Sequence, residues 1–292
     1  MKILSFDTEE WYIEKINFGG REFRYKELDD KLFELLDELD KHKFKATFFC
    51  LGQLAKEYPD RVRWISDRGH EIGCHTNTHK WLNKMTPEEL LADTTEALSR
   101  LEDLTGKKVE SFRAPAFSIS ADNKWALEVL VDCGIKYDAS IFPSSRDFGG
   151  FGGLNINEPC ILEYNKRQIK EFPISLANVL GRNMAFSGGG YFRLFPYWAL
   201  NMLSRNKDYV MWYFHLADLI QMKFKMKSKE EYEAYFKEPG TLKNRLLRYI
   251  KSNIGSNNAY QKLTKLLSSD DFVSVDVADK MIDWSTANTI KL

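Results

Sequence analysis

The first two-thirds of the chain alternates short apolar runs with longer amphipathic segments. Short apolar runs bounded by polar or turn residues predict buried strands, and they occupy residues 3–6, 46–51, 71–74, 111–113 and 135–138. Segments with apolar residues at helical spacing lie between them, at residues 25–41, 58–66, 86–105 and 122–133. The first of these segments forms one leucine face, made of Leu28, Leu32, Leu35, Leu36 and Leu39. The pattern predicts strands and helices in alternation.

The helix expected after residue 85 has the clearest boundaries. Thr86 is a favourable N-cap, Pro87 fits the first turn, and Glu89 stands at the capping-box position. Gly106 is expected to end the helix. Gly134 similarly ends the helix predicted over residues 122–133.

The pattern changes after residue 143. A glycine-rich loop is expected over residues 144–157, followed by strands at 171–174 and 191–194. A helix near residues 197–204 precedes the most apolar run of the chain, the strand predicted at 209–214. The charged region 223–265 is expected to be helical, and the apolar run 272–275 to be the last strand.

Five strand–helix alternations predict an α/β fold, with a parallel sheet covered by helices and either open or closed as a barrel. The sequence contains neither a long polar linker nor an internal repeat. We therefore expect residues 1–292 to form one elaborated domain.

The charge and cysteine content restrict the function classes. Forty-two basic residues balance 42 acidic ones, so nucleic acid is not an expected partner. The four cysteines form no C-x-x-C pair and are expected to be reduced thiols. The absence of a charged-then-apolar leader or a membrane-length apolar stretch predicts a cytoplasmic protein without a transmembrane segment. The sequence does not indicate an oligomeric state.

The segment His75-Thr76-Asn77-Thr78-His79 is the most informative in the chain. Two histidines four residues apart can reach one metal ion, and this pair follows an expected strand. Taken alone, the pair is equally compatible with two solvated histidines on a turn.

Other reactive side chains also follow predicted strands. Asp7 and Glu9 should project from one face of the first strand, because alternate side chains share a face, while Glu10 points the other way. Arg113 ends the fourth strand and needs an anionic partner, for which a carboxylate of the first strand is suitable. Asp138 ends the fifth strand, and His215 follows the apolar run 210–214. Parallel α/β folds place their chemistry at such strand ends.

These motifs resemble those of the polysaccharide deacetylases of the NodB-homology type, carbohydrate esterase family four. The resemblance covers roughly residues 1–220 and implies a distorted, incomplete (β/α) barrel of about seven parallel strands. Residues 221–292 would then be a C-terminal helical elaboration. The three motif segments are Asp7-Thr8-Glu9, His75-Thr76-Asn77-Thr78-His79 and Arg113-Ala114-Pro115-Ala116-Phe117.

The resemblance also implies a role for each motif residue. Asp7 would be the general base, oriented by Arg113, and His215 the general acid. Glu9, His75 and His79 would bind a divalent metal ion, with zinc preferred to other first-row ions. The Phe117 amide, beside Pro115, would stabilise the oxyanion, while Asp138 and Thr76 are candidate supporting residues. The reaction would remove N-acetyl groups from an N-acetylated saccharide.

Two departures from the family pattern leave alternatives open. The first motif has Thr8 between its carboxylates, and the acidic partner of His215 is not evident. One alternative is therefore an amidohydrolase of small cyclic or linear amides on the same barrel. Another is a catalytically silent glycan-binding protein. The segments 137–143 and 188–194 resemble a bacterial subgroup associated with surface-polysaccharide assembly, which implies a cytoplasmic protein that is peripheral to the inner membrane.

Overall fold

A computed structural model describes residues 1–292 except 145–148, 180–181, 221–224 and 237. Within the described residues, nine strands form one sheet and two form a separate hairpin. The sheet consists of β1 (Lys2–Thr8), β2 (Thr47–Cys50), β3 (Glu71–Cys74), β4 (Ser111–Phe112), β5 (Tyr137–Asp138), β6 (Cys160–Tyr164), β7 (Arg167–Glu171), β10 (Val210–His215) and β11 (Thr289–Lys291). The hairpin consists of β8 (Leu176–Val179) and β9 (Arg182–Ala185).

The strand order confirms the predicted α/β fold. Seven neighbouring strands, in the order β10-β1-β2-β3-β4-β5-β7, pair in parallel throughout. Strand β6 runs antiparallel to β7, and β11 pairs with β6. Strands β10 and β11 are the two edges of the described sheet, and no strand pair joins them. The barrel is therefore incomplete.

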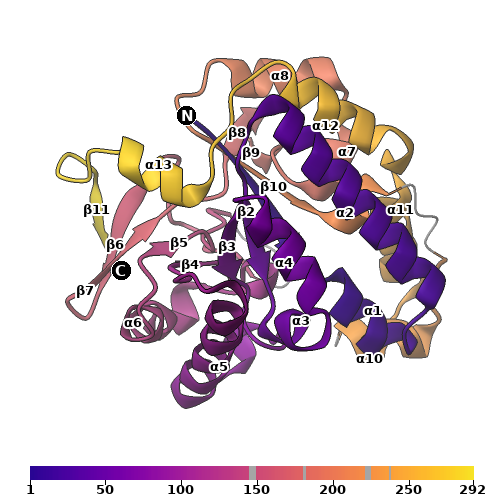
Figure 1. Cartoon of the computed structure of the whole chain (residues 1–292), viewed down its shortest axis with the longest axis horizontal. Helices are drawn as coiled ribbons and strands as arrows, with labels where there is room; N and C mark the ends of the chain where they lie inside the picture. The colour runs from indigo at the N-terminus through magenta and orange to yellow at the C-terminus, as the bar shows by residue number, and fades with distance from the viewer. Residues whose placement is uncertain (145–148, 180–181, 221–224, 237) are drawn as a thin grey trace.

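The helices lie around the outside of the strands (Figure 1). They are α1 (Glu10–Phe18), α2 (Glu22–His42), α3 (Gly52–Glu57), α4 (Pro59–Asp67), α5 (Pro87–Thr105), α6 (Trp125–Asp132), α7 (Gly189–Leu194), α8 (Tyr197–Arg205), α9 (Leu216–Leu219), α10 (Lys229–Phe236), α11 (Leu242–Asn253), α12 (Ala259–Leu267) and α13 (Val275–Met281). Short 3₁₀ turns occupy Leu82–Lys84, Pro115–Phe117, Ala121–Asn123 and Ser256–Asn258. No helix in the described part of the chain has both the length and the apolar character needed to span a membrane.

Strand alternation divides the buried residues between two hydrophobic clusters. Leu4 and Phe6 join the larger cluster, which also contains the buried leucines of α2. Ile3 faces the other way and joins the smaller cluster, with Phe49 and Met211. Asp7 has the parity of Ile3, so β1 directs it toward the inner side of the sheet.

Several predicted elements are confirmed with small changes at their ends. Helix α2 buries all five predicted leucines, and β3 has the predicted bounds. Thr86 and Glu89 form the capping box of α5, and Gly106 ends that helix in a left-handed conformation. The helix predicted over residues 58–66 begins at Pro59, and the separate helix α3 precedes it.

The later part of the chain requires three corrections. The strand predicted at 191–194 is part of helix α7, and its only buried large side chain, Phe192, packs edge-on against Trp212 and Phe214. The run 272–275 makes one bridge, between Val273 and Ile3, before α13 begins. The strand predicted at 171–174 lies earlier, as β7. Residues 145–148, 223–224 and 237 of the predicted loop and helical region lie outside the described residues.

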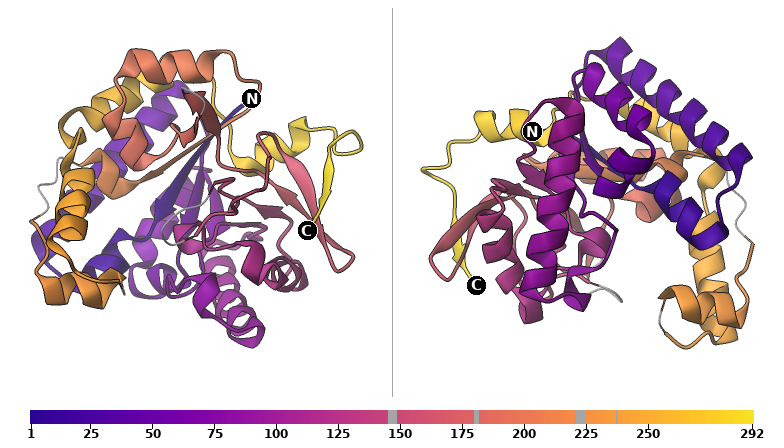
Figure 2. Two further views of the ribbon diagram at one scale, coloured as in Figure 1. Left: turned by 180° about the vertical axis from the view of Figure 1, so that it is seen from behind. Right: turned by 60° about the horizontal axis from the view of Figure 1, so that its bottom comes forward.

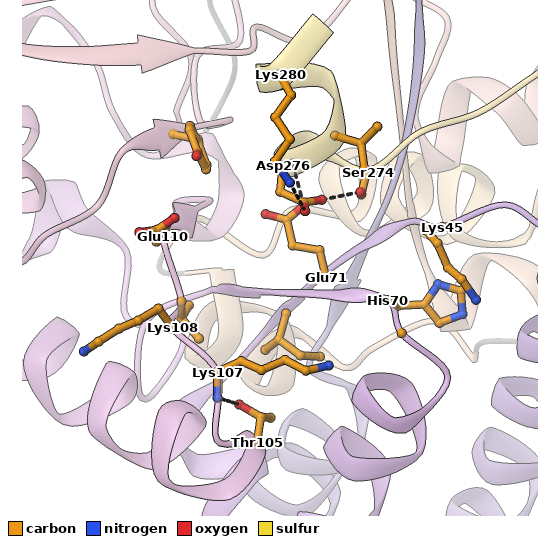
Figure 3. Close-up of a pocket in the computed structure, with 15 residues that line it drawn as sticks. Lys45, His70, Glu71, Thr105, Lys107, Lys108, Glu110, Ser274, Asp276 and Lys280 are labelled. Carbon is orange, nitrogen blue, oxygen red and sulfur yellow. Dashed lines mark hydrogen bonds and ion pairs between the residues drawn. The ribbon is translucent and has the colours of Figure 1, made fainter.

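Helix α13 packs over the amino-terminal edge of the sheet, opposite the edge that carries the motif residues. Glu71, the first residue of β3, points toward Asp276 of α13 (Figure 3). Its Oε2 accepts hydrogen bonds from the Thr47 hydroxyl at 2.6 Å and from the Asp276 amide at 3.0 Å. A cavity of about 300 Å³ lies beside this contact, lined by residues that precede or begin strands, among them Lys45, Lys107 and Tyr137.

The buried position of Glu71 predicts that the free energy of unfolding depends on pH. Burial, with a contribution from the charge of Asp276, raises the pKa of Glu71 to about 7. In the folded state Glu71 therefore keeps its proton up to about pH 7, whereas in the unfolded state it releases the proton near pH 4.5. The free energy of unfolding should thus decrease as pH rises from about 4.5 to about 7.

We therefore compare the free energy of unfolding of Glu71→Gln with that of wild type at two pH values. The difference should shift by about 1 to 2 kcal/mol in favour of the variant when the pH is raised from about 5 to about 8. The measurement is urea unfolding at both pH values. Glu22→Gln, at an exposed glutamate of α2, is the control. A Glu71→Gln difference from wild type that stays constant across this pH range would contradict the raised pKa.

Candidate metal centre and active site

The parallel register brings the predicted site residues to the carboxyl edge of the sheet. Asp7 at the end of β1 is aligned with His215 at the end of β10. His75 and Arg113 directly follow β3 and β4, whose last residues, Cys74 and Phe112, are partners. These side chains are distant in sequence, and sheet formation places them around one point.

Glu9, His75 and His79 converge as a three-residue cluster. Glu9 Oε2 lies 2.6 Å from His79 Nε2 and 3.3 Å from His75 Nε2. The three potential ligand atoms all lie within 4.8 Å of one another. In the described part of the chain this is the only such group of three or more histidine, cysteine or acidic residues.

The cluster fits a divalent cation. Glu9 Oε2 is buried, and no hydrogen bond of normal geometry satisfies it in the described residues. His75 Nδ1 lies 2.6 Å from the Arg113 carbonyl oxygen, so Nδ1 carries the proton and the Nε2 lone pair faces Glu9. Two imidazoles and one carboxylate are a ligand set that suits zinc and other first-row divalent ions.

The loop that carries the two histidines has a strained backbone. Thr76 and His79 have φ values of 68° and 61°, which residues other than glycine rarely adopt. The Thr76 hydroxyl accepts a hydrogen bond from the His79 amide at 3.1 Å, and Asp93 of α5 accepts one from the Asn77 amide at 2.7 Å. These bonds hold the unfavourable conformation that turns His79 toward Glu9. Thr76 thus holds the backbone of His79 in place and is not itself a member of the three-residue cluster.

Arg113 holds Asp7 in a fully buried ion pair. Its Nη1 donates to Asp7 Oδ1 at 2.8 Å, and its Nε donates to the Ala139 carbonyl at 3.1 Å. The guanidinium carbon lies 4.2 Å from the centre of the Phe49 ring. Three contacts therefore fix the orientation of the guanidinium, and with it the orientation of Asp7.

His215 lies between the carboxylates and a partner of its own. Its Nε2 is 3.6 Å from Glu9 Oε1 and 3.9 Å from Asp7 Oδ2. Its Nδ1 is 3.4 Å from Asp218 Oδ2, which also accepts a hydrogen bond from the His215 amide at 3.0 Å. Burial lowers the pKa of His215, but the three carboxylates outweigh burial and raise it to about 10.

The acidic partner of His215 is therefore Asp218, and the candidate assignment of Asp138 is corrected. Asp138 is buried in a carboxyl pair with Glu171, and it accepts a hydrogen bond from the Ser140 hydroxyl. Burial raises the pKa of Asp138 to about 6 and that of Glu171 well above its ordinary value, so the pair retains a proton near neutral pH. Asp138 is the last residue of β5, and four strands, β1 to β4, separate β5 from β10 in the sheet.

The third motif also differs from its predicted use. The Phe117 amide donates to the Ala114 carbonyl at 3.0 Å, within the turn that Pro115 begins. This amide is thus already hydrogen-bonded, and the geometry does not present it to a substrate oxyanion. Ala116 and Phe117 have φ values of 54° and 53°, so the turn after Arg113 is strained like the histidine loop.

Sequence reasoning missed Asp218, Glu171 and the contact made by Glu10. Asp218 had a local signal, because His215 and Asp218 stand at the ends of a capping box that starts α9. Glu10 is buried, and its Oε1 accepts a hydrogen bond from the Ala217 amide at 2.9 Å, which joins α1 to α9. Glu171 has no comparable signal, since only the pairing of β5 with β7 brings it to Asp138.

Two family profiles match consecutive parts of the chain. Residues 25–137 match the family described as polysaccharide deacetylase. Residues 139–279 match a domain of unknown function, DUF3473. The resemblance to polysaccharide deacetylases is thereby confirmed for residues 25–137, which include the second and third motif segments.

Individual relatives are similar over part of their length. A peptidoglycan-N-acetylglucosamine deacetylase of Bacillus cereus is 38% identical over 100 residues, 32% of this chain and 35% of its own. A chitooligosaccharide deacetylase of Azorhizobium caulinodans is 41% identical over 93 residues, 32% of this chain and 41% of its own. The chain thus spans less than half the length of these relatives. The crystal structure of a putative polysaccharide deacetylase from Mycobacterium smegmatis shares the fold, with a TM-score of 0.67, 15% identity, and coverage of 100% of this chain and 92% of its own.

The cluster geometry predicts binding of about one Zn²⁺ per chain. His79→Ala removes one of the three ligands, so its zinc occupancy after dialysis at limiting free Zn²⁺ should fall at least about tenfold below wild type. His42→Ala, which removes a histidine paired with Glu38 on α2, should bind like wild type. Metal analysis of the three proteins is the measurement, and full occupancy in His79→Ala would remove His79 from the ligand set.

Proposed function

We propose that the whole chain is a metal-dependent hydrolase that removes acetyl groups from N-acetylated saccharides, because residues 25–137 match the polysaccharide deacetylase family. The observation that carries the proposal is the arrangement of Glu9, His75 and His79 beside the Asp7–Arg113 pair and His215. Cleavage of an unactivated amide needs a general base, an electrophile and a general acid, and this arrangement offers a group for each task.

The three-residue cluster would hold the ion. A divalent cation bound by Glu9, His75 and His79 would polarise the acetyl carbonyl and make water more acidic. Zinc is the ion that we propose, because two imidazoles and a carboxylate are among its preferred ligand sets. His75 is already aligned for this role by the Arg113 carbonyl.

Asp7 would act as the base. Its Oδ1 is occupied by Arg113, whereas Oδ2 faces His215 at 3.9 Å and remains available for a proton. The buried guanidinium pairs with the carboxylate of Asp7 and restricts its rotation. Arg113 is thus a positioning residue, since it acts on the substrate only through Asp7.

His215 would deliver the proton to the departing amine. Asp218 fixes Nδ1, so Nε2 is the nitrogen directed toward Asp7 and Glu9. The carboxylates around it favour the protonated ring, which is the form that a general acid requires. A cation held by Glu9 would offset the pull of that carboxylate and bring the pKa of His215 closer to neutrality.

We further propose that residues 1–292 are one domain, although two family profiles meet near residue 138. Strand β5 pairs with β7 across this boundary, and one hydrophobic cluster contains residues from Leu4 to Phe272. A substrate from surface-polysaccharide assembly and a location in the cytoplasm, peripheral to the inner membrane, are proposals that rest on the sequence motifs and composition.

The test is a comparison of two substrates. The wild-type protein should release acetate from N-acetylglucosamine oligosaccharides, and His215→Ala should lose about a hundredfold or more in kcat. An aryl acetate has a leaving group that needs no proton, so its hydrolysis should fall much less in the same variant. Asp218→Asn should also lower kcat on the oligosaccharides, but by less, because Asp218 only orients His215 and does not itself deliver the proton.

Melting curves and zinc content of both variants provide the controls. The zinc content of both variants should remain near that of wild type, because neither side chain belongs to the metal cluster. Their melting temperatures should also remain near that of wild type. Equal losses on the two substrates would contradict the general-acid role of His215. No acetate release by the zinc-loaded wild-type protein from any N-acetylated saccharide would overturn the proposed function.

A further inference from the structure

Helix α11 is attached to the protein by its polar face. The Asn244 side chain donates to the Pro239 carbonyl at 2.9 Å, and Arg245 donates to the Lys227 carbonyl at 3.2 Å. At the far end, Arg193 of α7 donates to the Ser252 carbonyl at 2.9 Å. Arg245 and Ser252 lie on one side of the helix, because they are seven residues, or two turns, apart.

The opposite side of α11 exposes apolar side chains to solvent. Leu242 is 63% exposed, and Leu246 and Ile250 are each 46% exposed. These three residues follow one another at four-residue intervals, so they form a continuous row. Leu247, Tyr249 and Ile254 widen the row. We call these six residues the α11 apolar face.

The surface continues beyond the end of α11. Gly255 packs so closely against Arg193 that an added Cβ would lie 2.0 Å from its carbonyl oxygen. Ile254 therefore lies near Leu194, which is half exposed. Figure 2 shows α10 and α11 extending from the side of the barrel, so neighbouring elements do not cover the outer side of α11.

Helix α11 carries charges of one sign. Its sequence, residues 242–253, contains four basic residues and no acidic residue, although the whole chain is neutral. Lys243 is exposed within the α11 apolar face, where its long side chain can extend past apolar surroundings. A surface that combines an apolar row with basic residues matches an interface of acyl chains below negatively charged headgroups.

We propose that the α11 apolar face docks on an anionic lipid bilayer. The helix would lie in the plane of the interface, with its row of aliphatic side chains below the headgroups and Lys243 at their level. The barrel would remain in water, attached through the polar side of the helix. This inference does not rest on the proposed deacetylase activity.

A second copy of the chain is the competing occupant, and the charge disfavours it. In a two-fold dimer through α11, each apolar face meets the same face of the partner, and no acidic residue of α11 is present to pair with Lys243. A charge without a partner at an apolar contact opposes association, whereas anionic lipid neutralises it. The bilayer therefore satisfies both the apolar and the charged character of the face.

The test is co-sedimentation of the full chain with vesicles. Wild-type protein should bind vesicles of phosphatidylglycerol mixed with phosphatidylcholine more strongly than vesicles of phosphatidylcholine alone. The triple variant Leu242→Ser, Leu246→Ser, Ile250→Ser should lose about a hundredfold in partitioning, because three aliphatic side chains no longer enter the interface. Lys243→Gln should lose about fivefold on the anionic vesicles only, and high salt should abolish this difference.

Leu91→Ser is the matched control. Leu91 is 45% exposed on α5, far from α11 (Figure 1), and its replacement should leave vesicle binding unchanged. The melting temperature of the triple variant should stay near that of wild type, since its changes are on the surface. Wild-type protein that ignores both vesicle types would overturn the proposal. A wild-type dimer that the triple variant converts to a monomer, without vesicle binding, would assign the face to self-association instead.

Discussion

The buried guanidinium of Arg113 is the contact on which the site depends. It binds Asp7 from β1, donates to the Ala139 carbonyl that follows β5, and stacks on Phe49 of β2. The carbonyl of the same residue accepts the proton of His75 Nδ1 and thereby directs Nε2 to the metal cluster. One residue thus orients both the proposed base and a proposed ligand. A charge buried to this degree is tolerated only while its partners are in place, which couples the geometry of the base to that of the sheet.

The site gathers more acidic groups than basic ones. Asp7, Glu9, Glu10, Asp218 and the Asp138–Glu171 pair are all wholly or largely buried around the carboxyl edge, against Arg113, Arg193 and His215. The structure balances this excess partly by protonation, because burial raises the pKa of Glu10 to about 7 and that of Glu171 well above its ordinary value. A divalent cation at Glu9 would supply further positive charge at the point where two histidines already converge. The excess of acidic groups and the geometry of the potential ligands thus both favour a divalent cation at this site.

The sequence was sufficient to predict the parts of the fold that depend on local pattern. The leucine spacing of α2, the capping box of α5 and the apolar run of β10 each carry their own signal, and the parallel sheet follows from their alternation. The spacing of His75 and His79 likewise predicted that the two imidazoles could reach one point, whereas the place of Glu9 beside them was implied by the family resemblance. Pairings between distant segments were harder to foresee. Asp138 was a reasonable partner for His215 by motif order, but only strand order reveals that β5 and β10 are separated by β1 to β4. The α7 helix was mistaken for a strand because its single buried ring, Phe192, gives no helical periodicity over six residues.

Metal-assisted chemistry at Glu9, His75 and His79 is tested by measuring acetate release after chelation. Zinc would be removed from the wild-type protein with a chelator, and turnover of N-acetylglucosamine oligosaccharides measured before removal, after it, and after addition of about one equivalent of Zn²⁺. We expect activity to disappear with the metal and to return with it, while Asp7→Asn stays inactive even when zinc is bound. Full turnover by the chelated protein would contradict the account and favour an amidohydrolase that works on this barrel without a metal ion.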